Sequence, residues 1–170
     1  MLPARFAAAS CLLIAVLVPP ITVSAAQQAK AALPPPAPIP AQILSAKKAF
    51  IGNAGGEESR LFSGGPDRAY NQFYAAMKSW GRYELVATPA DADLLFEIQA
   101  TFPYSVPQVP RFQVAIRDPR THAALWAFVE WVEPAGLQSN RDKNFDAALN
   151  RIVSSLQELV AAPAASGAPH

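Results

Sequence analysis

The sequence contains few of the side chains on which metal centres and disulfides depend. Cys11 is its only cysteine, and His122 and His170 are its two histidines. A protein metal site needs several His, Cys or carboxylate ligands that converge, and a disulfide needs a second thiol. We therefore expect no metal site, no cofactor and no disulfide.

Catalytic patterns are missing as well. A Ser/His/Asp arrangement would need His122 as its base and Ser63 or Ser105 as its nucleophile, but no G-x-S-x-G turn occurs. The glycine-rich stretch Gly52–Arg60 lacks the Lys-Ser/Thr of a phosphate loop and carries two glutamates that would repel phosphate. We expect no catalytic residues, and we interpret the chain as a protein that is not an enzyme.

Charge of one sign is not concentrated anywhere in the chain. The net charge is +1, and no basic stripe of the kind that displaces counterions from nucleic acid is present. Nucleic acid is therefore not an expected partner. Glu97 and Glu130 are the acids that could neighbour each other across a sheet, as in glycosidases. Surface charge pairing, with Arg117 between them, is the interpretation that we prefer.

A hydrophobic run long enough to cross a bilayer is also absent, although a shorter one lies near the start. The apolar run Cys11–Val18 follows Arg5 and falls well short of the roughly 20 residues that a span needs. Val23 and Ala25 supply the small residues of a cleavage site before Ala26. We predict a signal peptide over residues 1–25 and a periplasmic or secreted protein with no membrane span after cleavage. A buried helix or a retained membrane anchor is the alternative.

Proline is abundant, and its distribution divides the rest of the chain. The prolines around Pro34–Pro36 fix φ and remove amide donors, which predicts a disordered linker over residues 26–44. The last residues, 162–170, are similar and predict a disordered tail. The folded domain is expected at residues 45–161.

Hydrophobic periodicity within residues 45–161 predicts five strands and two helices. The helices are expected at residues 66–80 and 140–161, where apolar side chains recur every three or four residues. The strands are expected at residues 47–53, 82–88, 94–102, 111–118 and 124–132. The order strand, helix, four strands, helix predicts an α+β fold, in which a mixed sheet of four to five strands carries both helices on one face.

The last predicted strand, "ALWAFVEWV", is apolar on both of its faces. Since helices cover only one face of such a sheet, we expect Trp126 and Phe128 on the uncovered face, as a contact surface for a partner. The proline-rich loop with Tyr104 is a second candidate for partner binding. The alternatives are a central position of the strand in the sheet, or cover from another segment.

Two stretches resemble small domains of the bacterial envelope. In Gly81–Ile98 a strand leads to an Ala-Asp pair and a second strand, and in Phe112–Trp126 a strand ends in Asp before a short turn and an aliphatic–Trp pair. The pattern, carried by Asp93, Asp118 and Trp126, is similar in outline to the amino-terminal domain of the Tol-system propeller protein and to curli-secretion-like domains. The resemblance implies an envelope location and an assembly or binding role with an envelope protein partner.

These observations together favour a non-catalytic exported domain with a binding or assembly role in the bacterial periplasm or envelope. The alternative is a small-ligand carrier or an enzyme accessory that uses a pocket between the helices and the sheet. Tyr70, Tyr74 and Trp80 would line that pocket.

Overall fold

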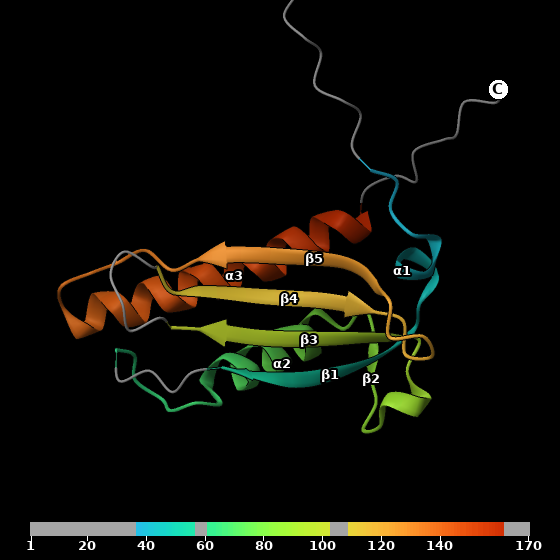
Figure 1. Ribbon diagram of the computed structural model, residues 1–170, viewed down its shortest axis with the longest axis horizontal. Coiled ribbons are helices and arrows are strands. Elements are labelled where there is room, and N and C mark those ends of the chain that lie inside the picture. The colour runs from blue at the N-terminus through green and yellow to red at the C-terminus, as the bar shows by residue number, and fades with distance from the viewer. Residues whose placement is uncertain (1–36, 57–60, 103–108, 162–170) are drawn as a thin grey trace, which may run out of the picture. The chain divides into compact units, whose positions relative to one another are not determined.

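Five strands form one mixed sheet in the computed structural model, which describes residues 37–56, 61–102 and 109–161 (Figure 1). The elements in chain order are α1 (Ala41–Ser45), β1 (Lys48–Gly56), α2 (Arg68–Trp80), β2 (Glu84–Leu85), the 3-10 helix η1 (Pro89–Asp91), β3 (Leu94–Thr101), β4 (Arg111–Arg117), β5 (Ala124–Trp131) and α3 (Gln138–Ala161). The sheet order is β2-β1-β3-β4-β5. β1 is parallel to β2 and β3, while β4 is antiparallel to both of its neighbours.

The predicted α+β fold is confirmed, with both longer helices on one face of the sheet. Figure 1 shows α2 and α3 behind the strands, and no other described element in front of them. The predicted signal peptide, residues 26–36 of the linker, the loop with Tyr104 and the tail at residues 162–170 lie outside the described residues.

The core lies between the two helices and the sheet, as the periodic apolar positions predict. From the helices, α2 contributes Ala69, Phe73 and Met77, and α3 contributes Phe145, Ala148, Leu149, Ile152, Val153 and Leu156. From the sheet, β3 and β4 contribute alternate residues, which are Leu94, Phe96, Ile98, Phe112, Val114 and Ile116. Phe112 and Phe145 meet edge to face at 4.7 Å between ring centroids, which joins α3 to the sheet.

Helix α2 ends at Trp80, as we predicted, and begins at Arg68, two residues after the predicted start at Pro66. Asp67 is the N-cap residue, and Gly81 ends the helix in the left-handed conformation with φ 66°. The amide of Gly81 donates to the carbonyl of Met77 at 3.3 Å. A side chain other than glycine is strained at this φ, so Gly81 fixes the direction in which the chain leaves the helix.

Helix α1 lies where we expected linker. Ile43 is fully buried in the core, and Ile39 packs against it. The Arg82 guanidinium donates to the carbonyl of Leu44 at 2.9 Å, which holds the helix beside β2. The folded unit thus begins before residue 45, because one buried isoleucine and these hydrogen bonds order a segment that proline would otherwise keep extended.

Several predicted boundaries differ from the observed ones, those of β2 and α3 among them. β2 has only two residues, since it pairs with the first residues of β1 and the chain then turns into η1. Helix α3 begins at Gln138, two residues before its predicted start at residue 140. The carboxylate of Asp142 on this helix accepts hydrogen bonds from Ser63.

No helix in the described ranges is both long enough and apolar enough to cross a membrane.

Candidate binding surface

The register between β4 and β5 decides which side chains of β5 face the helices. Trp126 lies opposite Ile116, and Phe128 lies opposite Val114. Both of these β4 residues are fully buried in the core, and residues directly opposite each other lie on the same face of a sheet. Trp126 and Phe128 therefore point toward the helices, where they are half-buried against the core. Our expectation that they lie on the uncovered face is wrong.

The uncovered face of β5 carries the alternate residues instead. Ala127, Val129 and Trp131 form what we call the outer strip. Val129 and Trp131 are 49% and 51% exposed, and Ala127 is exposed as well. The guanidinium of Arg111 lies 5.6 Å from the ring centroid of Trp131, which fixes the indole at one end of the strip. The outer strip is thus an apolar surface that no described element covers.

A polar pair occupies the same face further into the sheet, and a second pair lies on the opposite face. Arg117 Nε donates to Glu97 Oε2 at 2.6 Å on the uncovered face. Glu130 lies on the opposite face, where it pairs with Arg151 of α3. Glu97 and Glu130 do not meet, so they do not form the carboxylate pair of a glycosidase. Each glutamate is paired with an arginine, as we preferred, but Arg117 pairs with Glu97 alone and does not lie between the two glutamates.

The outer edge of β5 presents unpaired backbone groups. The amide of Val132 points toward β4, because it donates to the carbonyl of Pro110 at 2.8 Å. Backbone groups alternate in direction along a strand, so those of Trp131, Val129 and Ala127 point away from β4, at the end of the sheet order. The carbonyl of Trp131 accepts a hydrogen bond from Arg151 Nη2 at 3.1 Å. In the part of the chain that the structure describes, the N–H and C=O groups of Ala127 and Val129 have no strand beside them.

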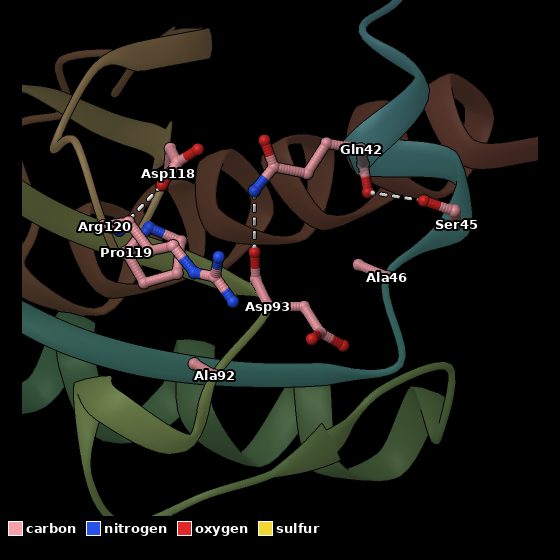
Figure 2. A pocket seen from close by; sticks show the side chains of 8 residues that line it. All are labelled: Gln42, Ser45, Ala46, Ala92, Asp93, Asp118, Pro119 and Arg120. Atoms are coloured by element: carbon pink, nitrogen blue, oxygen red, sulfur yellow. Dashed lines mark hydrogen bonds between the residues drawn. The ribbon is translucent and has the colours of Figure 1, made fainter.

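A polar hollow of about 330 Å³ lies at the end of the sheet where β3 begins and β4 ends (Figure 2). It is lined by Gln42, Ser45, Ala46, Ala92, Asp93, Asp118, Pro119 and Arg120. β3 begins after Asp93 and β4 ends before Asp118, and these strands are antiparallel, so the topology places both aspartates at the same end. The sequence places one aspartate directly before β3 and the other directly after β4. This feature could have predicted that the two lie close together.

Both aspartates of the hollow are bonded to backbone amides. Asp93 Oδ2 accepts from the amides of Lys47 and Lys48, each at 2.9 Å, and these bonds lower the pKa of Asp93. Asp118 Oδ1 accepts from the amides of Arg120 and Thr121 at 2.7 and 3.1 Å, which lower the pKa of Asp118. These bonds fix the start of β1 and the turn after β4, a structural role.

His122 lies in this turn, with φ 57°. Its amide donates to the carbonyl of Asp118 at 2.9 Å, and its carbonyl accepts from Arg117 at 3.1 Å.

Ser63, one of the nucleophiles that we considered, donates its hydroxyl to Asp142 at 2.8 Å. Ser105 lies outside the described residues. Within the described ranges, no three His, Cys, Asp or Glu side chains are grouped so that they could hold a metal ion.

The place between α2 and the sheet where we considered a ligand pocket is filled by side chains. Phe73 and Met77 of α2 are 0% and 1% exposed, and Phe96 of β3 is 0% exposed. The ring of Trp80 packs edge-on against that of Tyr83 at 5.5 Å. In the described residues, side chains thus occupy the space between α2 and the sheet from which we derived the small-ligand alternative.

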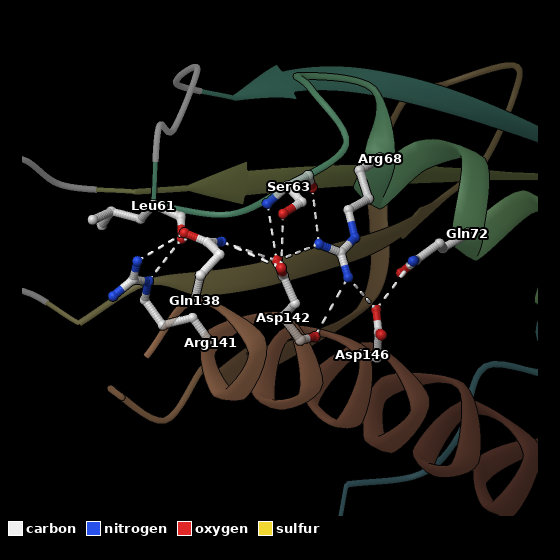
Figure 3. A network of polar contacts seen from close by, with 8 residues as sticks. All are labelled: Leu61, Ser63, Arg68, Gln72, Gln138, Arg141, Asp142 and Asp146. Carbon is white, nitrogen blue, oxygen red and sulfur yellow. Dashed lines mark hydrogen bonds and ion pairs between the residues drawn. The ribbon is translucent and has the colours of Figure 1, made fainter. Parts of the chain in front are cut away.

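A polar network joins the loop after β1 to α2 and α3 (Figure 3). Arg68 of α2 bonds Asp142 at 2.7 Å and Asp146 at 2.6 Å, and its side chain is only 13% exposed. Asp142 also accepts from the amide and hydroxyl of Ser63 at 2.9 and 2.8 Å. These bonds, the Ser63 amide first, lower the pKa of Asp142 far below its ordinary value. Because Arg68 and Asp142 are 74 positions apart, no local pattern could have indicated this pairing.

Asp142→Asn is expected to make the protein both less stable and less sensitive to acid. A carboxylate whose pKa is lowered by folding contributes stability above its ordinary pKa of 3.8, and this contribution is lost as the pH falls toward the lowered value. Urea unfolding at about pH 7 and about pH 3 should therefore show a smaller loss of unfolding free energy for the variant than for the wild type.

The matched control for this prediction is Glu158→Gln, a change on the exposed side of the same helix. It removes the same formal charge outside the network. The difference in unfolding free energy between the two pH values should therefore stay close to that of the wild type. An Asp142→Asn variant that loses as much stability in acid as the wild type would contradict the role that we assign to Asp142.

Comparisons with known proteins give matches among solved structures only. No family model matches the chain, and no curated protein matches it significantly. The chain is similar to a DUF330 protein from Xanthomonas campestris, with 13% identity, TM-score 0.47 and coverage of 70% of this chain and 86% of that one. It is also similar to a PelC dodecamer from Paraburkholderia phytofirmans, with 14% identity, TM-score 0.44 and coverage of 65% and 88%.

A third similar structure is the C-terminal domain of LpoB from Salmonella enterica. It has 13% identity, TM-score 0.38 and coverage of 52% of this chain and 84% of that one. All three are bacterial domains, and similarity at this level does not transfer a function. The resemblance to the Tol-system propeller protein and to curli-secretion-like domains is not shown by these matches and stays a prediction.

Proposed function

We propose that the chain is a non-catalytic binding or assembly domain, exported to the bacterial periplasm or envelope, that contacts an envelope protein through β5. The observation that carries the proposal is the combination of an unpaired backbone edge with the exposed outer strip on one strand. The sequence features of a signal peptide support export.

An open edge of this kind is unusual in a protein that stays alone. Edge strands are ordinarily protected by charged side chains, proline or a bulge, because an open edge pairs readily with another strand. Between Leu125 and Val129, β5 has no charged residue and no proline, and the ladder to β4 is irregular only at the start of the strand, beside Leu125. The exposed indole of Trp131 adds the type of side chain that is enriched where proteins meet. Both features support the addition of a partner strand along β5.

The polar groups elsewhere support a role without catalysis. The carboxylates of Asp93 and Asp118 are held by backbone amides, and His122 contributes its backbone to a turn. Glu97 and Glu130 are paired with arginines on opposite faces of the sheet. In the described residues, these groups stabilise the fold rather than converge on a substrate.

A photocrosslinking residue in place of Val129 tests the proposal. The full chain, including its predicted signal peptide, is expressed in a bacterium, and the periplasmic fraction is irradiated. We expect discrete covalent adducts from position 129, because this side chain is exposed beside the open edge of β5. The same residue in place of Glu158, on the helical side, is the control. Equal adducts from both positions, or none from position 129, would overturn the proposal.

A further inference from the structure

We propose that the strand that pairs with β5 is β5 of a second copy of this chain, in antiparallel orientation. This inference rests on the proposed binding role of β5. It is carried by the self-complementarity of the strand, in its backbone groups, its side chains and its charge.

The available backbone groups select one register. A register centred on Phe128 places Ala127 opposite Val129 of the second copy, and Val129 opposite Ala127 of the second copy. In this register the N–H and C=O groups of both residues, which no described strand pairs, form reciprocal hydrogen bonds. A register centred on Val129 would instead need the carbonyl of Trp131, which already accepts from Arg151. A register centred on Ala127 would need regular pairing at Leu125, where the ladder to β4 is interrupted.

The side chains fit the same register. On the helix side, the half-buried Phe128 meets Phe128 of the second copy, an aromatic pair that sheets favour. On the uncovered face, Ala127 meets Val129 of the second copy, so the two outer strips lie side by side. Glu130, the only charged residue of β5, lies opposite Trp126 of the second copy. No like charges face each other.

The resulting pair is symmetric and closed. An antiparallel pairing of identical strands has its two-fold axis perpendicular to the sheet, so both helical layers lie on the same side. The two sheets join into one, and the two uncovered faces become continuous. The pairing therefore removes the open edge of both copies at once, which a single chain cannot do.

Sedimentation of the purified full chain over a concentration series is the first test. We expect a reversible dimer, and we expect Val129→Lys to weaken it at least about tenfold, because the lysine places like charges beside the shared edge. Gln113→Lys puts the same charge on β4, opposite Val129 but away from the edge, and should leave the dimer intact. Circular dichroism checks that each variant is folded, and Ala127→Lys replaces Val129→Lys if the latter is not.

The register has its own test in a background of Cys11→Ser. Copies with Ala127→Cys and copies with Val129→Cys should form a disulfide when they are mixed, and neither variant alone should form one as fast. A wild-type chain that is monomeric at every concentration, or a dimer that survives Val129→Lys and Ala127→Lys, would overturn the inference. If the chain is monomeric but position 129 crosslinks to a different protein, the binding role stands and only the identity of the partner is wrong.

Discussion

Replacing Phe96 with alanine is expected to lower the free energy of unfolding by about 3–5 kcal/mol. Phe96 lies on β3 near the middle of the sheet and is 0% exposed. Its neighbours on the adjacent strands are Ile51 and Ile116, and its ring lies 5.5 Å from that of Tyr83. The change leaves a cavity that the strands on both sides prevent from collapsing. The variant therefore loses the transfer free energy of the removed atoms and also carries the cost of the cavity.

The control for Phe96 is Gln99→Ala on the same strand. Gln99 is exposed on the uncovered face, so its truncation should change the unfolding free energy by no more than about 0.5 kcal/mol. Urea unfolding of both variants, followed by circular dichroism, measures the difference. Equal effects of the two changes would mean that the helices do not cover the face of β3 that carries Phe96.

The fold could be predicted because its main elements repeat their apolar residues with a clear period. In β4, Phe112, Val114 and Ile116 are buried, while their neighbours Gln113 and Arg117 are more exposed. Ala115 is buried as well, but the large apolar residues all lie at alternate positions, and such a pattern admits only one orientation of the strand against a helical layer. The same holds for the three- and four-residue spacing of α2 and α3. Local pattern therefore determined the number, order and layering of the main elements.

The orientation of β5 could not be predicted in the same way, because both of its faces are apolar. Trp126 and Trp131 differ by an odd number of positions and so lie on opposite faces, but neither face is marked by polar residues along its whole length. The choice depends on the register with β4, a contact between strands. A bridge from Glu130 to Arg151 of α3 agrees with that register, and it too joins residues that are distant in sequence.

Helix α1 and the Arg68 network escaped prediction for a related reason. α1 has five residues, too few to show a period, and its position depends on the burial of one side chain, Ile43. The pairing of Arg68 with Asp142 depends on how α2 and α3 pack together. In both cases the deciding contact is tertiary, so no local window of sequence contains it.

Truncating the two tryptophans of β5 one at a time tests the orientation of the strand. Trp126→Ala is expected to lower the unfolding free energy by about 2–3 kcal/mol, less than for a fully buried tryptophan, because Trp126 is half-buried against the core. Trp131→Ala is expected to cost less than about 1 kcal/mol, because its indole is 51% exposed and rests mainly against Arg111.

The two changes remove the same atoms from the same strand, so the difference between them depends on how each indole is buried. Unfolding is measured at low protein concentration, where self-association contributes least. A larger loss for Trp131→Ala than for Trp126→Ala would mean that β5 presents Trp126 and Phe128 outward. The outer strip would then be core, and the proposals for β5 would lose their surface. If Trp131→Ala costs less than Trp126→Ala, as we expect, Trp131 contributes almost nothing to the stability of the fold. Its indole is then available for contact, as a binding surface requires.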